Sequence, residues 1–497
     1  MSRIRLKPAT LASSNATAER PASAGNPSAT GLLAWLLLLA LLAACGGSFG
    51  QELRGETVLH FSGKVPTGEE RFFFLPFDVP PGTAEIEIRH DDLSEKNILD
   101  WGVDDPAGFR GWGGGNRENA IIGREAASGG YLPGPLPAGK WEIVVGKALL
   151  EEDPALYEVE ITLRATATRP AQAARLPYVP SPALDTVGRW YSGDFHLHSL
   201  ESDGSQTMAH VIDFAESRGL DFILFSEHNT TSQLSWYADL QAKHADLLLV
   251  PGTEFTSYQG HANAIGTTGW INHRIGTRHA TIAGAIAEVH AQGGLFSINH
   301  PLLFVGDLCL GCGWEHDVDP QSIDAIEIRN AIFTATSFWE ELLAAGSHAA
   351  ALGGSDDHHG GTRTSALVTP VGTPTTWIFA HELSVAALLE GIRAGRTFVQ
   401  FAGPDAPRIE STMSGPRERD TVRAESAILH ARVENGRGKL LRTIRNGARI
   451  DEVPIDADPF AYSMEITAPI TGEDRYRHEI IGGSETLVVA SHIWLQR

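Results

Sequence analysis

The chain contains little cysteine, and its pattern cannot build a zinc ribbon. Only three cysteines occur in 497 residues, and two of them, Cys309 and Cys312, stand in one Cys-Leu-Gly-Cys motif. A zinc ribbon needs a second such pair, which the sequence lacks. The pair is therefore expected to be either a loop disulfide or two free thiols, and neither form suggests a chemical role.

Basic residues are also scarce relative to acidic ones. The chain has 39 lysines and arginines against 61 aspartates and glutamates, which gives a formal net charge of −22. Nucleic-acid binding needs clustered basic side chains that displace counterions, so no nucleic-acid polymer is expected as a partner. An anionic substrate would have to be attracted by a local positive centre such as bound metal.

No hydrophobic run is long enough to span a bilayer comfortably. The apolar run at 32–44 follows a basic start and ends in Leu-Ala-Ala-Cys, which resembles a bacterial lipobox with a lipid-modified Cys45. Residues 1–45 are therefore predicted to be a leader, and the protein an exported periplasmic or cell-surface lipoprotein that meets the membrane only through this lipid. A plain signal peptide or an uncleaved anchor remains the alternative. Export would permit a disulfide.

Two segments show the pattern of antiparallel sheets. Short stretches of alternating apolar and polar residues, broken by proline and glycine, fill 55–170 and return in 407–497. This pattern predicts an N-terminal and a C-terminal β-sandwich. The clearest expected strands are 72–75, 84–88, 141–145, 157–161, 427–433 and 486–490.

Between them, at 189–402, the pattern changes to strand and helix in alternation. Near-continuous apolar runs indicate buried parallel strands, and the segments between them carry apolar residues at helical spacing. This order predicts an α/β barrel, in which chemistry gathers where the strands end. The runs are 221–225, 247–250, 294–298 and 325–328, and the expected helices are 208–218, 280–292 and 336–345.

Metal-binding residue types follow the predicted strands. His196 and His198 are one residue apart, so on a strand they share a face, and Asp203 follows in a turn set by Gly204. A lone histidine is more often structural, but a series of strand-end imidazoles and carboxylates predicts a metal centre. The later members are Glu227, His228, Glu254, His261, His300, Asp356 and His358, while His273 and His279 remain loop candidates.

The ordered motifs H-x-H, S-D-G, S-E-H, G-T-E, N-H-P and G-S-D-x-H resemble the PHP (polymerase and histidinol phosphatase) superfamily over about 193–401. The resemblance implies a distorted (β/α)7 barrel that holds two or three divalent metal ions. The G-H-A-N-A-I-G and G-I-R-A-G-R-T-F segments resemble, more narrowly, the carbaryl hydrolase (CehA/McbA) branch.

The resemblance also implies three groups of ligands, and Glu254 belongs to two of them. Many relatives carry histidine where Asp203 stands, and Asp357 and His359 match no motif role. The implied groups are His196, His198, Glu254 and Asp356 for one metal, Glu254, His261 and His300 for a second, and Asp203, His228 and His358 for a third.

The chemistry implied is hydrolysis by metal-bound hydroxide. Imidazoles and carboxylates suit Zn²⁺, Mn²⁺ and Fe²⁺ alike, and bound water reaches a pKa of about 7. Glu254 and Asp356 are the expected catalytic carboxylates. Arg363 is the candidate cation for the developing charge of a phosphate, followed by Arg329 and Arg396; a surface salt bridge is the alternative for each.

These expectations favour a metal-dependent hydrolase of a small-molecule ester, first a phosphomonoester or phosphodiester. Hydrolysis of a carbamate or carboxylic ester is the second reading, from the branch resemblance. A non-catalytic metal-binding or adhesive surface lipoprotein is the alternative from another class. The metal, the substrate and the oligomeric state stay open.

Overall fold

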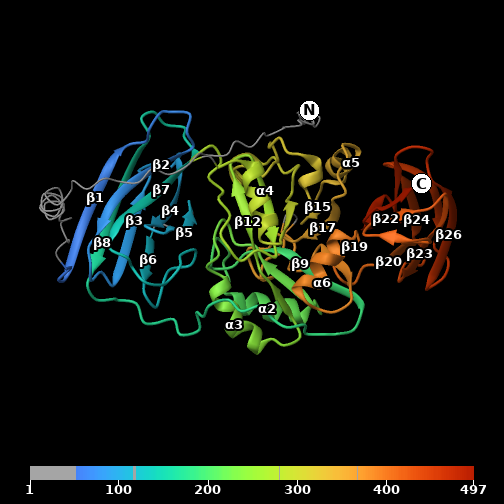
Figure 1. Cartoon of the computed structure of the whole chain (residues 1–497), viewed down its shortest axis with the longest axis horizontal. Coiled ribbons are helices and arrows are strands. Elements are labelled where there is room, and N and C mark those ends of the chain that lie inside the picture. Colours follow the sequence, from blue (N-terminus) through green and yellow to red (C-terminus); the bar gives the residue numbers. More distant parts are fainter. Residues whose placement is uncertain (1–51, 116–118, 279, 366–367) are drawn as a thin grey trace, which may run out of the picture.

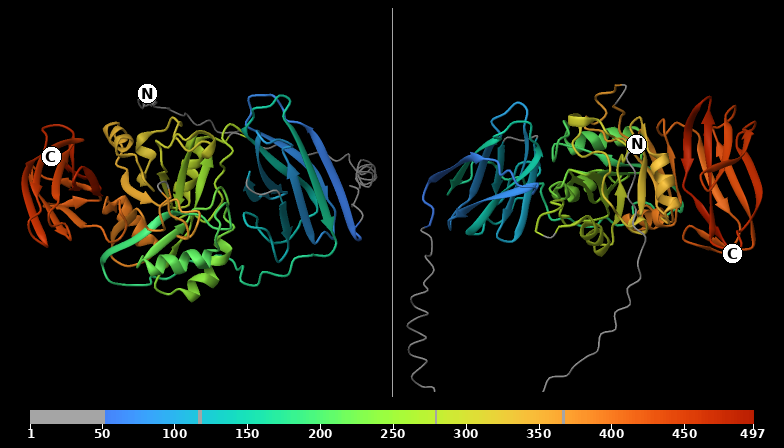
Figure 2. Two further views of the ribbon diagram at one scale, coloured as in Figure 1. Left: turned by 180° about the vertical axis from the view of Figure 1, so that it is seen from behind. Right: turned by 90° about the horizontal axis from the view of Figure 1, so that it is seen from above.

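The computed structural model of the chain describes residues 52–115, 119–278, 280–365 and 368–497. The predicted leader with Cys45, and His279, lie outside the described residues. Three parts follow one another along the molecule, coloured blue to cyan, green to orange and orange to red (Figure 1). Two further views show the same succession (Figure 2). Within the described ranges, no helix is long and apolar enough to cross a bilayer.

The N-terminal part consists of two four-stranded antiparallel sheets, ordered β1-β8-β3-β6 and β2-β7-β4-β5. Alternation places Ile86 and Ile161 of one sheet and Ile143 and Val145 of the other in one hydrophobic core. The strands are β1 (Glu56–Lys64), β2 (Phe72–Val79), β3 (Glu85–Asp91), β4 (Ile98–Asp105), β5 (Gly108–Gly114), β6 (Asn119–Gly123), β7 (Gly139–Leu149) and β8 (Leu156–Arg164).

The middle part, β9 to β19, carries all the described α-helices. Three begin at a threonine or serine cap, such as Thr207, whose hydroxyl accepts from the backbone of His210 at 3.3 Å. The helices α2, α4 and α5 fall where expected; α3 and α6 were not expected. They are α2 (Met208–Ser217), α3 (Leu234–Lys243), α4 (Ile282–Ala291), α5 (Thr336–Ala344) and α6 (Val385–Arg393).

The strands of this part form two sheets that meet at their edges. One runs β11-β10-β9-β18-β19, and the other runs β12-β13-β14-β15-β16 with β17 also on β15. They are β9 (Arg189–Leu197), β10 (Phe222–Phe225), β11 (Leu248–Val250), β12 (Gly252–Ser257), β13 (Gly260–Ile265), β14 (Leu295–Ile298), β15 (Ala325–Asn330), β16 (Phe333–Thr334), β17 (Ala350–Gly354), β18 (Thr375–Ala380) and β19 (Thr397–Gln400).

The pairing differs in part from the expected parallel strands. β9, β10 and β11 are parallel, as are β14, β15 and β17, but β13 and β18 run antiparallel to their neighbours. The short turn between β12 and β13 leaves no room for a crossover helix, so the two strands form a hairpin. Single parallel bridges, Leu197 to Asp357 and His228 to Glu254, join the two sheets.

The C-terminal part is not separated from the middle part as two independent domains would be. β28 pairs with β19, so one large sheet runs through both parts, and Trp377 and Phe398 share a core with Ile409, Val433 and Val488. A three-stranded sheet β20-β23-β26 completes it. The strands are β20 (Arg408–Met413), β21 (Arg417–Glu418), β22 (Thr421–Arg423), β23 (Ser426–Glu434), β24 (Leu440–Arg445), β25 (Ala448–Pro454), β26 (Phe460–Thr467), β27 (Glu473–Gly482), β28 (Glu485–Ala490) and β29 (Ile493–Gln496).

Candidate metal centre

The nine predicted ligands lie together where the two sheets of the middle part meet. His196 and His198 come from the end of β9, Glu254 from β12 and His261 from β13. The bridge between His228 and Glu254 joins the end of β10 to β12 at this point. The other members, Asp203, His300, Asp356 and His358, lie in loops that follow β9, β14 and β17.

Two of these loop residues have an unusual backbone. His300 and Asp356 adopt positive φ angles of 26° and 56°, a region that few non-glycine residues occupy. Glu327 accepts from the backbone N–H of His300 at 2.9 Å, and the carbonyl of His196 accepts from that of Asp356 at 2.9 Å. Such strain persists only where surrounding contacts hold it, and it is typical of functional sites.

The first group contains His196, His198, Glu254 and Asp356. The Oδ1 atom of Asp356 lies 3.1 Å from Nε2 of each histidine, and the two Glu254 oxygens lie 3.2 Å from Nε2 of His196 and 3.6 Å from Nε2 of His198. Ligand atoms about 2.1 Å from one tetrahedral cation lie about 3.4 Å apart. The observed separations therefore fit one divalent cation.

Glu254 also faces a second group. Its Oε1 atom lies 3.4 Å from Nδ1 of His261 and 3.4 Å from Nε2 of His300. One carboxylate is thus shared between two sets of imidazoles, as the resemblance implied. Cys312 also lies near these two histidines, but its sulfur is bonded to Cys309, so it has no thiolate to offer.

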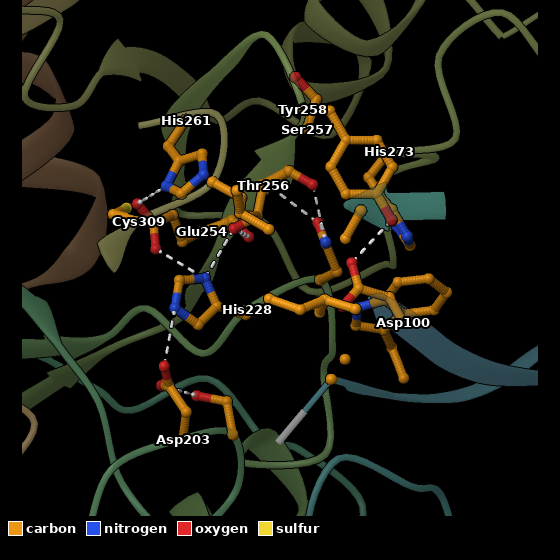
Figure 3. Close-up of a pocket in the computed structure, with 18 of the residues that line it drawn as sticks. Asp100, Asp203, His228, Glu254, Thr256, Ser257, Tyr258, His261, His273 and Cys309 are labelled. Carbon is orange, nitrogen blue, oxygen red and sulfur yellow. Dashed lines mark hydrogen bonds and ion pairs between the residues drawn. The ribbon is translucent and has the colours of Figure 1, made fainter. Parts of the chain in front are cut away.

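The third group, Asp203, His228 and His358, is more open. The Oδ2 atom of Asp203 lies 3.4 Å from Nε2 of His228 and 3.2 Å from Nε2 of His358. His228 reaches from Asp203 to Glu254, whose Oε2 lies 3.0 Å from its Nδ1 (Figure 3). These three side chains are between a fifth and a third exposed, whereas Glu254 is fully buried, so this group faces the cavity.

Electrostatics make the cluster a strong cation site. Burial raises the pKa of Glu254, but the charges of His196 and His228 outweigh it and hold that pKa well below its usual value. Burial lowers the pKa of His358, yet Asp203 raises it to about 9. The carboxylates therefore draw positive charge into a buried place, where metal ions would replace the protons.

Unpaired polar atoms provide a further test of the fit. Within the described part of the chain, Nε2 of His261 is buried without a hydrogen-bond partner, and Nε2 of His196 and Oε2 of Glu254 meet only charged groups of other candidate ligands. Leaving such atoms unpaired costs free energy. Coordination to a cation would satisfy them, so the residues present fit divalent metal binding.

Gly204 allows Asp203 to reach the cluster. A Cβ atom on Gly204 would lie 2.5 Å from the carbonyl carbon and oxygen of His198, so only glycine fits this turn. The backbone N–H of Gly204 donates to the carbonyl of Ser199 at 2.9 Å. The Ser-Asp-Gly motif thus folds the chain back against the end of β9.

Glu327 is a functional candidate that sequence reasoning missed. It lies on β15, and its Oε1 atom lies 3.0 Å from Nδ1 of His196. Its Oε2 atom accepts from the backbone of His300 and, at 3.1 Å, from Nδ2 of Asn330. Glu327 therefore orients two candidate ligands. The available signal was a carboxylate inside the apolar run 325–328.

Glu227 supports the cluster by binding the loop between His198 and Asp203. Its carboxylate accepts from the hydroxyls of Ser199 and Ser202 and, at 3.1 Å, from the backbone of Ser199. Burial raises the pKa of Glu227 to about 7. Asp357, which matched no motif, accepts from the backbone N–H groups of Gly361 and Val371 and so holds the loop that carries Asp356.

The structure does not bring Arg363 to the cluster. This side chain is exposed and does not line the cavity, because the loop carries it out to solvent. Arg329 lies over the ring of Phe401, and Arg396 lines a different cavity near the C-terminal part. The position of Arg363 therefore does not support its predicted role in stabilising phosphate charge.

A cavity of about 500 Å³ opens onto the cluster. The candidate ligands Asp203, His228, Glu254, His261, His300, Asp356 and His358 line one side of it. Among its described lining residues there is no lysine or arginine. A negative charge on a ligand would therefore have to be met by bound cations.

Cys309 and Cys312 form a disulfide in the loop after β14, which agrees with one of the two expected forms. Contrary to expectation, this loop is part of the site. Cys309 lines the cavity, and Nδ1 of His300 lies 3.2 Å from the carbonyl oxygen of Cys312. The disulfide thus shapes the backbone that orients a candidate ligand.

Comparison with known proteins gives short or distant matches. No protein-family model matches the chain. Over 65 residues the chain is 35% identical to phosphoribosyl 1,2-cyclic phosphate 1,2-diphosphodiesterase of Eggerthella lenta, which is 13% of this chain and 24% of that protein. The match thus spans about a quarter of that curated relative.

Two solved structures are similar to parts of the chain. One, from Bacteroides vulgatus, is described as a two-domain protein containing a predicted PHP-like metal-dependent phosphoesterase; it is 20% identical, covers 66% of this chain and 100% of its own, and has a TM-score of 0.36. The other is an amidohydrolase from Chromobacterium violaceum, 15% identical over 36% of this chain and 93% of its own, with a TM-score of 0.24.

Proposed function

We propose that this protein is a metal-dependent hydrolase that cleaves phosphate esters with two or three divalent cations. The observation that carries the proposal is the convergence of nine side chains from distant parts of the chain, with ligand atoms within each group 3.1–3.4 Å apart, as coordination of a shared cation requires. The ordered motifs support a place in the PHP superfamily and, more narrowly, in its carbaryl hydrolase branch.

The residues would divide the work as follows. Divalent cations held here supply Lewis acidity and make water a nucleophile near neutral pH. Glu254 faces three groups of imidazoles and so fixes their spacing, while Asp356 touches both histidines of β9. Glu327 keeps the ring of His196 in place. The more exposed Asp203, His228 and His358 face the incoming ester.

Phosphate esters lead because the cavity pairs a cation site with walls that carry no lysine or arginine among the described lining residues. The non-bridging oxygens of a phosphate are natural ligands for clustered divalent cations. The short match to a phosphodiesterase agrees with this choice.

The test compares p-nitrophenyl phosphate, bis(p-nitrophenyl) phosphate, 1-naphthyl methylcarbamate and p-nitrophenyl acetate. The purified chain is stripped with chelator and reloaded with Mn²⁺ or Zn²⁺. We expect turnover of a phosphate substrate that disappears with chelator and returns with metal. Turnover of only the carbamate or the acetate would replace the proposal with the ester-hydrolase alternative. Tight metal binding without any turnover would favour a metal-binding surface protein.

We further propose that the protein is exported and anchored by a lipid on Cys45. The apolar run at 32–44 and the Leu-Ala-Ala-Cys ending support this proposal. Replacement of Cys45 by serine in the full chain is expected to release the protein from the membrane fraction of a bacterial host. Unchanged membrane association of Cys45→Ser would contradict the lipid anchor.

A further inference from the structure

The cavity has a wall that belongs to the N-terminal part. Phe72 of β2, Asp100 of β4 and Trp112 of β5 line it, together with Gly113, Gly114 and Gly115. The metal-binding residues lie on the other side, so the cavity is shared between the two parts. A bound molecule would touch both.

Buried contacts fix this wall against the middle part. The guanidinium of Arg274 donates to both carboxylate oxygens of Asp104 at 2.6 and 2.7 Å, with both side chains buried. The hydroxyl of Thr230 donates to the carbonyl of Gly130 at 2.8 Å, and the hydroxyl of Ser232 accepts from the backbone N–H of Gly130 at 3.1 Å. The wall therefore has a defined position.

His273 brings two ring nitrogens into this shared region. It lines the cavity and is buried, and neither of its ring nitrogens has a hydrogen-bond partner in the described part of the chain. Its ring packs against Trp112, Trp270 and Phe72 at centroid distances of 4.4, 5.8 and 6.1 Å. Burial and the nearby charge of Arg274 hold the pKa of His273 well below its usual value, so the ring is neutral.

Asp100 and Tyr258 form the second polar element of the wall. The Tyr258 hydroxyl donates to Asp100 at 2.7 Å (Figure 3). The Tyr258 ring stacks on that of Phe72 at a centroid distance of 5.6 Å. Burial raises the pKa of Asp100 to about 6. Gly146 of β7 makes room for this pair, because a Cβ atom there would lie 2.1 Å from the Tyr258 hydroxyl.

We propose that His273 and Asp100, with the rings of Phe72, Trp112 and Tyr258, form a subsite for the hydroxyl-bearing part of the substrate, a sugar or polyol phosphate. This proposal rests on the proposed phosphoesterase function and names the substrate class. The phosphate would face the cations, and the sugar or polyol would face the wall from the N-terminal part.

The side chains of this wall favour a ligand that carries hydroxyl groups. A neutral imidazole offers one donor and one acceptor, which a hydroxyl group matches and a quaternary cation or a second phosphate does not. The carboxylate of Asp100 accepts from further hydroxyls, and aromatic faces pack on the apolar faces of a sugar ring. With no lysine or arginine among the described lining residues, a second anionic group has no permanently charged partner on this side.

The test compares His273→Phe with the unchanged chain, both loaded with Mn²⁺. Phenylalanine keeps the aromatic packing and removes both nitrogens. The substrates are ribose 5-phosphate and glycerol 2-phosphate, which carry hydroxyls, and p-nitrophenyl phosphate, which does not. We expect kcat/KM for the hydroxyl-bearing substrates to fall at least about tenfold, mainly through KM. The value for p-nitrophenyl phosphate should change less than about twofold.

Two further variants test whether the effect is specific to the proposed subsite. Asp100→Asn, which keeps the size of the side chain, is expected to shift the substrate ratio in the same direction. His478→Phe removes another buried histidine, one outside the cavity, and should leave the ratio unchanged. Metal content and near-ultraviolet circular dichroism check that the centre and the fold are intact. An equal loss on all three substrates, or an unchanged ratio in His273→Phe, overturns the subsite.

A binding measurement separates this proposal from the proposed function. The fluorescence of Trp112 and Trp270, which contact His273, is followed during titration with ribose 5-phosphate and with inorganic phosphate. Tighter binding of ribose 5-phosphate that His273→Phe removes supports the subsite even if the chain hydrolyses no phosphate ester. Equal binding of the two probes overturns the subsite even if phosphate esters are hydrolysed.

Discussion

Glu254 is the residue on which the candidate centre most depends. Its two oxygens face His196, His198, His228, His261 and His300 at 3.0 to 3.6 Å, and the side chain is fully buried. Asn299 also donates to it at 2.9 Å. A neutral amide at this position keeps the shape but removes the charge that two groups of ligands share.

Glu254→Gln is therefore expected to lower phosphoesterase turnover more than about 100-fold and to reduce bound metal, with the fold intact. Metal content by mass spectrometry, initial rates and circular dichroism measure these effects. Glu390→Gln, on the exposed face of α6, is the matched control and should resemble the unchanged chain. Full turnover in Glu254→Gln would contradict the shared-carboxylate role.

A residue far from the centre makes the C-terminal part sensitive to acid. Burial lowers the pKa of His478 to about 3 from its usual 6.5, and its Nδ1 atom lies 2.8 Å from the hydroxyl of Ser411. The folded state therefore stays neutral here while the unfolded chain takes up a proton as the pH falls below about 6.5. The free energy of unfolding therefore decreases as the pH falls from the pKa of the unfolded state toward the pKa of the folded state.

Between pH 7 and pH 5 this residue alone is expected to lower the free energy of unfolding by about 2 kcal/mol. His478→Phe should lose correspondingly less stability over that range. Urea denaturation followed at both pH values measures the difference. His430→Gln, on the partly exposed face of β23, is the control. An equal pH dependence of His478→Phe and the unchanged chain would show that the residue does not contribute.

At the scale of elements, three neighbouring strands carry the support of the centre. β15 provides Glu327, β9 provides His196, and Gly354 ends β17 between them. A Cβ atom on Gly354 would lie 2.1 Å from Oε1 of Glu327 and 2.4 Å from Cβ of His196. The glycine thus leaves the space in which the carboxylate orients the histidine.

Gly354→Ala is expected to displace Glu327 and to weaken metal binding about 10- to 100-fold, as the loss of a supporting contact does. Competition with a metal-sensitive chelating dye measures the affinity. Gly68→Ala, where an added Cβ meets nothing within 4 Å, is the control and should bind metal normally. Normal affinity in Gly354→Ala would show that the strands adjust.

Element prediction succeeded where the pattern is local. The helix over 282–291 and the strand over 295–298 lie close to the expected ranges, because apolar spacing and threonine caps act within one element. The strands β13 and β18 were not among the expected ones, and their antiparallel direction could not be read from composition, because a buried apolar strand has the same composition whichever way it runs.

At the scale of the whole molecule, the N-terminal part is held against the middle part by ion pairs that differ in burial. The Arg274 and Asp104 side chains are at most 9% exposed, whereas Arg278, paired with Glu142 at 2.6 Å, is half exposed. Removing one partner of a buried pair leaves an uncompensated charge, and an exposed pair contributes little. The two pairs differ in burial but are adjacent, because Nη1 of Arg278 also lies 3.9 Å from Oδ2 of Asp104.

Arg274→Leu is expected to destabilise the docked N-terminal part by about 3–5 kcal/mol, while Arg278→Ala should cost less than about 1 kcal/mol. Calorimetry should show an earlier, separate transition in Arg274→Leu, and limited proteolysis should cut sooner in the connection at 165–188. Combining Arg274→Leu with Asp104→Leu should recover part of the stability, because no charge is left buried alone. A single unchanged transition would contradict the docking role.

The sequence by itself determined which residue types stand at the strand ends and in what order. His196, His198, Glu254 and Asp356 could be found because strand alternation and turn residues are properties of neighbouring positions. Only the tertiary structure decided what faces them: Glu327 behind His196, Arg363 out in solvent, the wall around His273 and Asp100, and β28 beside β19. Those contacts join residues far apart in the chain, and packing between elements selects them, which no local pattern records.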